Sequence, residues 1–403
     1  MPFPTRIPIA ALAAAALAAC AAGPDAPAVP RAPDAAFCQV GGWLFHTDFE
    51  SAALYACRAS DGGPILTIAP EYAPINPSPW YAWRIASGDD SAATPVEVTV
   101  RQHYRFARHR YDPWVSADGE RWEPLAESRV RVLGDGLVEF RLAVPADGLY
   151  VAAQPPLDSA AMGRWANALA AAHGLHATRV AQSVGGRAVM AYRTDFAGRR
   201  GTLVLTGRQH PPEITGGLAF QDFAERLFAA DPLAERFRAR FAIGLVPEIN
   251  PDGVARGHWR TGLRGVDLNR DWGPFTQPET RGVAAWLAAL DGEAPLWLFV
   301  DFHSTWQDVF YVPHPEDDPQ PAGFAAEWRR RLEARLGEAM PGWSGQHNPG
   351  LPTAKSWVRK AYGIFAMTYE VGDGTPRERI RTTAEAAAEE MMKLLLELEE
   401  SAP

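Results

Sequence analysis

The C-terminal part of the chain alternates short apolar runs with longer amphipathic segments, and this alternation limits the fold more than any other feature. The apolar runs predict buried strands at Thr202–Thr206, Phe241–Val246, Leu296–Phe302 and Ile364–Tyr369. The intervening and following segments predict helices at Phe220–Ala230, Thr280–Ala289, Gly323–Leu336 and Thr382–Glu399. Strands that are apolar on both faces and separated by helices are typical of an α/β layer with a mixed, largely parallel central sheet flanked by helices.

A different pattern occupies residues 37–153, where short runs rich in β-branched and aromatic residues are separated by turn residues. Their alternation, seen at 95–100, 128–133 and 137–142, predicts an N-terminal antiparallel β-sandwich. A chain of 403 residues is longer than one domain usually is. We therefore expect a multidomain protein with a β-sandwich domain at 37–153 and an α/β domain at 154–403. Asp158 or Ser159 should cap the first helix of the second domain, which continues to His173.

The first 20 residues are typical of a secretory signal. Arg6 precedes a short apolar, alanine-rich segment, Ile7 to Leu17, which is too short to span a bilayer. Leu17-Ala18-Ala19-Cys20 resembles a bacterial lipobox, in which Cys20 is lipidated; signal cleavage beside an incidental cysteine is the alternative. Residues 21–36 are rich in Pro, Ala and Gly and predict a flexible tether. We expect a periplasmic protein of the cell envelope that is anchored to a bacterial membrane through Cys20.

Cysteine usage and charge bear on the compartment and the partners. In an oxidising compartment Cys38 and Cys57 permit one disulfide, while two buried thiols are an equal alternative. The net charge of −9 argues against a nucleic-acid partner, which favours a basic surface. The basic, aromatic-rich stretch 101–111 is interpreted as a strand with a solvated edge.

Polar residues gather directly after the predicted strands of the α/β domain, where open α/β sheets bind their ligands. Taken in chain order, these residues are His210 and Glu213, then Arg260, Asp267, Asn269 and Arg270, then His303, and finally Glu370. Residues that follow different strands meet at one edge of the sheet. Such a convergence is far less expected by chance than any one of the motifs.

The residue types fit a catalytic metal centre. Two imidazoles and one carboxylate are a ligand set for a catalytic Zn²⁺ that keeps a fourth position open for water. Pro211 and Pro212 exclude a regular helix at His210 but suit a turn that enters a helix near Glu213. A zinc-bound water is a nucleophile near neutral pH and needs a base, for which Glu370 is available.

These motifs resemble the signature of the carboxypeptidase A-type zinc metallocarboxypeptidases. The nine-residue step from Arg260 to Asn269 and the sequences Asn250-Pro251-Asp252-Gly253 and Asp267-Leu268-Asn269-Arg270 are similar to one branch. That branch comprises the cytosolic carboxypeptidases, or protein deglutamylases, and their bacterial relatives. Its members also carry a β-sandwich domain before the catalytic domain. The resemblance covers roughly residues 40–395.

The resemblance implies a role for each of the gathered residues. His210, Glu213 and His303 would bind one Zn²⁺ per chain. Glu370 would act as general base toward the bound water and then as acid toward the leaving amine, while Arg260 would stabilise the oxyanion. Asn269 and Arg270 would hold the terminal carboxylate of the substrate.

The residues around this constellation carry further expectations. Lys355 stands where the resemblance places the floor of the pocket for the departing side chain, so it would favour an acidic C-terminal residue; a surface lysine at a helix start is the alternative. Residues 345–350 hold no tyrosine, although the family commonly has one there that covers the substrate. His258 and His347 are expected to be exposed loop residues. Asp301 is expected to face away from His303 and to form a core hydrogen bond.

The leading functional hypothesis is a zinc metallocarboxypeptidase that hydrolyses the C-terminal residue of peptides or proteins, with a preference for acidic residues. An envelope amidase or deacylase of the same fold, acting on peptidoglycan peptides or N-acyl amino acids, is the first alternative. A non-enzymatic envelope lipoprotein that binds a partner is the second alternative.

Overall fold

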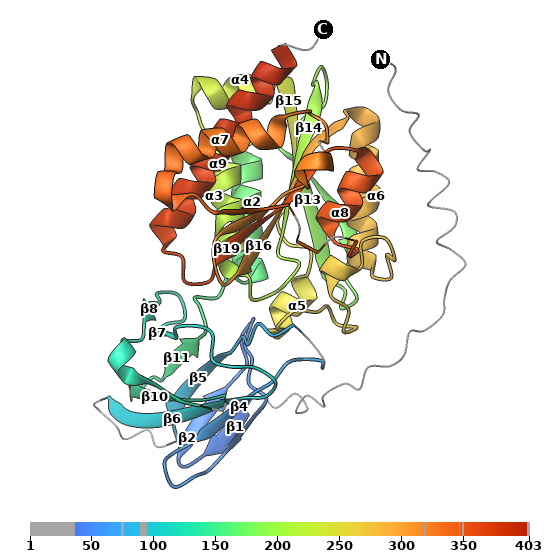
Figure 1. Cartoon of the computed structure of the whole chain (residues 1–403). Coiled ribbons are helices and arrows are strands. Elements are labelled where there is room, and N and C mark those ends of the chain that lie inside the picture. Colours follow the sequence, from blue (N-terminus) through green and yellow to red (C-terminus); the bar gives the residue numbers. More distant parts are fainter. Residues whose placement is uncertain are drawn as a thin grey trace.

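The computed structural model describes residues 37–73, 76–88, 95–134, 136–317, 319–345, 347–348 and 350–400. A β-rich region occupies residues 37–152, and an α/β region follows it along the chain (Figure 1). The signal and tether predicted for residues 1–36, with the lipidated Cys20, lie outside the described residues.

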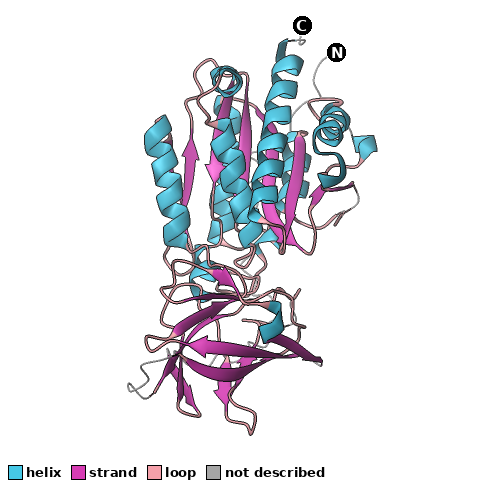
Figure 2. Ribbon diagram, turned by 90° about the vertical axis from the view of Figure 1, so that its left-hand side faces the viewer, coloured by secondary structure: helices cyan, strands magenta, loops and turns pink. Residues whose placement is uncertain are grey.

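The described part of the β-rich region contains two sheets (Figure 2). The first has the order β1 (Phe37–Val40), β2 (Trp43–His46), β5 (Ala82–Ser87), β11 (Leu149–Ala152), β7 (Trp114–Ser116), β8 (Glu123–Pro124). The second has the order β3 (Ala56–Arg58), β4 (Ile65–Ile68), β6 (Val96–Tyr104), β10 (Leu137–Val144), β9 (Val130–Gly134).

Buried side chains of both sheets belong to one hydrophobic cluster, in which Trp83 of β5 and Phe140 of β10 take part. Neighbouring strands are antiparallel except β4 and β6, which are parallel. The prediction of a purely antiparallel arrangement is therefore wrong at this pair. The long connection between the two strands allows them to run in the same direction. The sandwich stays a prediction about how these two sheets pack.

Cys38 and Cys57 form a disulfide, with their Cα atoms 6.3 Å apart. The bond joins β1 at the end of the first sheet to β3 at the end of the second. Of the two states that the sequence left open for this cysteine pair, the structure has the disulfide.

The central sheet of the α/β region has eight strands among the described residues. Their order is β12 (His176–Gln182), β13 (Ala188–Arg193), β15 (Phe241–Val246), β14 (Gly201–Gly207), β16 (Leu296–Thr305), β19 (Phe365–Gly372), β17 (Val309–Tyr311), β18 (Gly342–Ser344). The four strands predicted from the apolar runs are β14, β15, β16 and β19, which lie together at the centre and are mutually parallel. Antiparallel neighbours on both sides make the sheet mixed, as predicted.

The helices of the α/β region lie on both faces of this sheet (Figure 1). They are α2 (Ser159–His173), α3 (Ile214–Leu227), α4 (Pro232–Arg240), α5 (Pro251–Arg256), α6 (Pro278–Glu293), α7 (Phe324–Leu336), α8 (Ala354–Tyr362) and α9 (Arg377–Glu400). The Asp158 side chain accepts the Ala161 N–H at 2.6 Å and caps α2, as predicted. The short helices α4 and α5 were not predicted, and α8 was considered only as a helix start at Lys355.

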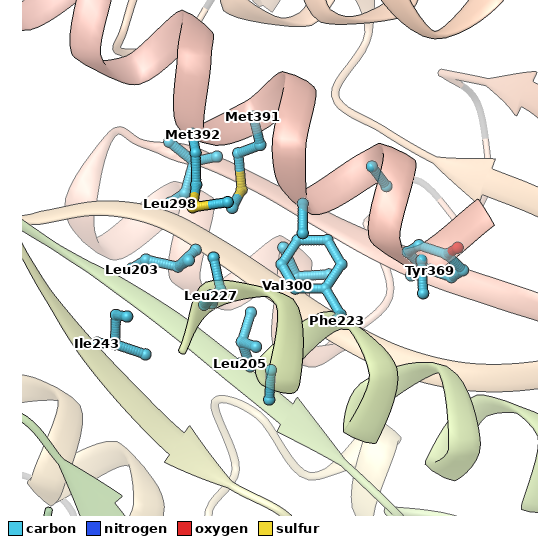
Figure 3. Packing of buried hydrophobic residues seen from close by; sticks show 14 of the residues in the cluster. Leu203, Leu205, Phe223, Leu227, Ile243, Leu298, Val300, Tyr369, Met391 and Met392 are labelled. Carbon is cyan, nitrogen blue, oxygen red and sulfur yellow. The ribbon is translucent and has the colours of Figure 1, made fainter. Parts of the chain in front are cut away.

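Alternate residues of the central strands pack on opposite faces, because side chains alternate along a strand. Leu203, Leu205 and Val300 belong to the cluster under α3 and α9, as Figure 3 shows. Val204 and Phe299 belong instead to the cluster that includes residues of α6 and α8. Each central strand therefore has two buried faces, which explains its continuous apolar run.

The segment after β15 packs against the β-rich region. Trp259 is 1% exposed, belongs to the hydrophobic cluster of the β-rich region, and donates from its indole nitrogen to the Trp80 carbonyl oxygen at 3.0 Å. An added Cβ on Gly257 would lie 2.6 Å from the Ala52 carbonyl oxygen, so only glycine fits this contact. Among the described residues, no helix combines the length and apolarity needed to cross a membrane.

Replacing Trp259 tests this contact. Because Trp259 is fully buried between the two regions, we expect Trp259→Ala to lower the free energy of unfolding by about 3–5 kcal/mol. Trp306, which is 67% exposed, provides the matched control, and Trp306→Ala should cost less than about 1 kcal/mol. Denaturant unfolding of the variants measures both values, and equal losses would contradict the packing described.

Candidate metal centre

The predicted ligands come from a turn and from the end of a neighbouring strand. His210 and Glu213 lie between β14 and α3, and His303 lies near the end of β16. Pro211 and Pro212 lie in the turn, and α3 begins directly after Glu213. Gly216 in the first turn of α3 lies against β16, where an added Cβ would lie 2.4 Å from the His303 carbonyl oxygen. This close contact brings the turn and the strand together.

The three side chains are buried and offer ligand atoms that all lie within 4.8 Å of one another. Glu213 Oε1 is 2.7 Å from His210 Nδ1, and Glu213 Oε2 is 2.6 Å from His303 Nδ1. The two Nδ1 atoms are 3.2 Å apart. Burial opposes ionisation of Glu213, but His210 and His303 outweigh it and hold the pKa of this carboxyl below its usual range.

Two further carboxylates contact the other ring nitrogens. Asp267 Oδ1 is 2.9 Å from His210 Nε2, and Asp301 Oδ2 is 2.7 Å from His303 Nε2. An imidazole that donates its Nε2 proton to a carboxylate presents an unprotonated Nδ1. Two such lone pairs 3.2 Å apart, each also facing a Glu213 oxygen, repel one another unless protons or a metal cation lie among them. The donor set therefore fits a divalent metal such as Zn²⁺.

The expectation that Asp301 faces away from His303 is wrong. The two residues are two positions apart on β16, and side chains two apart share one face of a strand. The expected core hydrogen bonds exist, because Asp301 also accepts from Thr206 Oγ1 at 2.7 Å and Gln209 Nε2 at 2.6 Å. The Asp-x-His spacing is a sequence signal from which Asp301 can be identified as the partner of His303. The pairing of Asp267 with His210 has no such signal, because the two residues are 57 positions apart.

Glu370 lies beside the ligands on the next strand. The pairing of β16 with β19 sets His303 opposite Glu370. Glu370 Oε2 is buried and has no hydrogen-bond partner among the described residues. Burial raises the pKa of Glu370 to about 7, although His303 lowers it. The carboxyl therefore exchanges a proton near neutral pH, which suits a general base.

The loop after α5 brings Arg260 to the same place. Arg260 Nε donates to Asp267 Oδ2 at 2.6 Å, so Asp267 bridges Arg260 and His210. Burial opposes ionisation of Asp267, but His210 and Arg260 hold the pKa of its carboxyl well below the usual range. The bridge fixes a guanidinium beside the candidate metal ligands.

Asn269 and Arg270 lie in the short 3-10 turn η2 (Leu268–Arg270). Asn269 Nδ2 is 3.2 Å from His303 Nε2, and its Oδ1 accepts the N–H of Ala354 at the start of α8. Arg270 donates to the Asn269 carbonyl oxygen at 2.8 Å and, within the described chain, forms no ion pair.

Lys355 lies in the first turn of α8 and is 8% exposed, so the alternative of a surface lysine is wrong. Its Nζ lies 5.1 Å from the ring centroid of Tyr311. Burial lowers the pKa of Lys355 to about 8, although Glu370 raises it. No carboxylate in the described ranges forms an ion pair with it. Lys355 is therefore a buried cation close enough to Glu370 and Arg270 for their charges to affect its pKa.

The two loop histidines are less exposed than expected. His258 is 6% exposed, and its Nδ1 lies 2.9 Å from the Thr261 carbonyl oxygen, because the β-rich region covers this loop. His347 stacks on Tyr311 with ring centroids 3.6 Å apart, next to Lys355.

The β-rich region also reaches the site, which the sequence did not reveal. Arg110 was expected at a solvated edge, but its side chain is buried and donates from Nε to Asp373 Oδ2 at 2.7 Å. Asp373 follows Glu370 by three residues. Residues 263 positions apart give no local pattern, so sequence reasoning had no signal for this pair.

The chain is similar in sequence to known carboxypeptidases. Cytosolic carboxypeptidase-like protein 5 of Ailuropoda melanoleuca is 32% identical over 185 residues, which is 44% of this chain and 20% of that protein. Cytosolic carboxypeptidase 6 of Mus musculus is 32% identical over 107 residues, 25% of this chain and 20% of that protein. The matched segments thus span about one fifth of the length of these relatives.

Solved structures share the fold. A metallo-carboxypeptidase from Burkholderia cenocepacia has a TM-score of 0.71 at 18% identity, covering 89% of this chain and 100% of its own. A metallo-carboxypeptidase from Pseudomonas aeruginosa, in complex with (2-guanidinoethylmercapto)succinic acid, has a TM-score of 0.67 at 22% identity, covering 88% and 99%. Residues 162–390, more than half of the chain, match the family model described as zinc carboxypeptidase. The protein belongs to the zinc carboxypeptidase family.

Proposed function

We propose that the protein is a zinc-dependent metallocarboxypeptidase that removes the C-terminal residue of peptides or proteins through a zinc-activated water. The observation that carries this proposal is the pair of Nδ1 atoms, from His210 and His303, that converge on Glu213 with Glu370 beside them. Membership of the zinc carboxypeptidase family supports it.

His210, Glu213 and His303 would hold the metal, which when bound supplies a polarised water and an electrophile for the scissile carbonyl. Glu370 accepts the proton of the attacking water and returns it to the leaving amine. Its raised pKa of about 7 suits both transfers. Arg260 keeps its guanidinium beside the ligands through Asp267 and stabilises the negative charge that develops on the carbonyl oxygen.

Arg270 and Asn269 would hold the terminal carboxylate of the substrate. Arg270 forms no ion pair among the described residues, so it can accept a carboxylate without breaking an existing contact. Asn269 lies between His303 and the start of α8 and adds a polar contact. This recognition would restrict the reaction to free C-termini.

We further propose a preference for acidic C-terminal residues. Lys355 is a buried cation that, in the described part of the chain, has no carboxylate partner. A buried unpaired charge is costly, and a substrate carboxylate would offset that cost. A C-terminal Glu or Asp carries two carboxylates. The terminal carboxylate would pair with Arg270, and the side-chain carboxylate would pair with Lys355.

The envelope location and the lipid anchor on Cys20 are also proposed. The lipobox-like sequence that ends at Cys20 supports them, as does the disulfide between Cys38 and Cys57, since disulfides persist in oxidising compartments.

The function is tested by digesting peptides with the zinc-loaded protein and detecting released C-terminal residues by mass spectrometry. We expect one zinc per chain, and Glu370→Gln should lower kcat by roughly 10²–10⁴-fold because the general base is lost. The exposed Glu338 provides the matched control, Glu338→Gln, which should retain activity. A protein that takes up no zinc, or a fully active Glu370→Gln, would refute the proposal.

Reversing the charge at Lys355 tests the acidic preference. Lys355→Glu should lower kcat/KM for peptides ending in Glu or Asp by roughly 10–100-fold, because a charged hydrogen bond is replaced by repulsion. Peptides ending in Leu should be affected far less. Lys360→Glu, at an exposed position of the same helix, is the control. An unchanged ratio of kcat/KM between acidic and neutral peptides would contradict this assignment.

The pKa of Lys355 predicts a pH dependence. Burial lowers that pKa to about 8, so the side chain is charged below this pH and loses its charge above it. The ratio of kcat/KM for Glu-terminated over Leu-terminated peptides should therefore fall as pH rises through about 8. Taking the ratio cancels pH effects common to both substrates. Lys355→Arg, which stays charged, should give a flat ratio; a flat ratio in the wild-type protein would contradict the assignment.

A further inference from the structure

The carboxylate of Glu71, in the β-rich region, holds the loop that carries Arg260. Its Oε2 accepts the N–H of Trp259 at 2.7 Å. Its Oε1 accepts the N–H groups of Arg260 at 3.0 Å and Thr261 at 2.7 Å, and the Thr261 hydroxyl at 2.8 Å. One side chain thus binds three successive backbone amides that are at least 188 residues away in the sequence.

These contacts replace the secondary structure that the loop lacks. Helix α5 ends at Arg256 and the turn η2 begins at Leu268, so residue 260 lies in neither. Backbone hydrogen bonds from His258 to Gly253 and from Gly262 to Val266 lie on either side of the bound amides. Among the described residues, Glu71 supplies the acceptor for all three amides between them. Successive amides that point at one anion form a nest, and such charge-assisted bonds fix the local backbone.

We propose that Glu71 is a positioning residue for the reaction, which sets the place of the Arg260 guanidinium and makes the β-rich region part of the active site. The inference rests on the proposed function. From Glu71 the contacts pass through the backbone of Arg260, then from Arg260 Nε to Asp267, and from Asp267 to His210 Nε2. A displaced loop would therefore move the oxyanion-stabilising group and loosen the carboxylate that orients a metal ligand.

Other contacts between the β-rich region and this loop hold the ends of the loop and do not involve the Arg260 amide. Tyr72 donates its hydroxyl to the Leu263 carbonyl oxygen at 2.8 Å, and Trp259 donates its indole N–H to Trp80. Tyr72 is next to Glu71 in the sequence and contacts the same loop, so Tyr72→Phe removes one junction hydrogen bond without touching residues 259–261.

The central experiment is a double-mutant cycle on the zinc-loaded, full-length protein with a peptide that the wild type cleaves. Glu71→Gln keeps the side-chain shape but removes the charge and sets an NH2 donor against at least one of the amides. Because Arg260 acts on the transition state, Glu71→Gln should lower kcat by roughly 10–100-fold and leave KM within about twofold. In the Arg260→Ala background, Glu71→Gln should cause no further loss, since both changes remove the same contribution. Tyr72→Phe should keep kcat within about twofold of the wild type.

A readout independent of catalysis accompanies the cycle. Amide hydrogen exchange of residues 257–262 should accelerate in Glu71→Gln, while exchange in β14 stays as in the wild type. If Glu71→Gln does not fold, Thr261→Val removes only the hydroxyl bond and should give a smaller loss in kcat with the same unchanged KM.

The possible outcomes separate this inference from the function on which it rests. Unchanged kcat in Glu71→Gln, or an equal loss in the wild-type and Arg260→Ala backgrounds, would overturn the positioning role. A wild-type protein that releases no C-terminal residue would overturn the proposed function. In that case faster exchange at residues 257–262 in Glu71→Gln would still support control of the loop by Glu71, and unchanged exchange would reject it.

Discussion

The repulsion between two imidazole lone pairs is the constraint on which the site depends. Asp267 lies 2.9 Å from His210 Nε2 and Asp301 lies 2.7 Å from His303 Nε2, where each can accept a hydrogen bond, and the two Nδ1 atoms face one another at 3.2 Å. Neither carboxylate belongs to the candidate ligand set, yet an acceptor at each Nε2 favours an unprotonated Nδ1 on the side where a metal would bind. Much of the surrounding structure holds these carboxylates, through Thr206 and Gln209 for Asp301 and through Arg260 for Asp267.

The central sheet places this chemistry on one of its two faces. Along β16, Leu298, Val300 and Phe302 pack under α3 and α9, whereas Asp301 and His303 alternate with them and therefore face the side of α6 and α8. Lys355 and the start of α8 lie on that side as well, and Asn269 joins them to His303. The β-rich region adds Glu71 and Arg110 from a part of the chain far away in sequence.

Sequence patterns predicted those features that depend on local order. The apolar runs identified the four central strands, and the polar residues after them include the candidate ligand cluster and Glu370, which the structure brings together. Contacts between residues that are far apart in the sequence were not predicted. Asp267, Arg110 and Glu71 act on residues 57 or more positions away, and no spacing relates them to their partners. Asp301 is different, because its side chain could be placed from the alternation of side chains along β16. Residues two positions apart share one face of a strand, and the prediction wrongly set Asp301 and His303 on opposite faces.

The pairing of β16 with β19 sets His303 directly opposite Glu370. Tyr369 and Val371, on either side of Glu370, belong to the hydrophobic cluster on the other face of the sheet. A slip of one residue in this pairing would therefore bury the carboxylate among apolar side chains and turn aromatic and aliphatic groups toward the ligands. The same alternation therefore sets both the core and the position of Glu370, so a change of register would cost stability and displace Glu370 together.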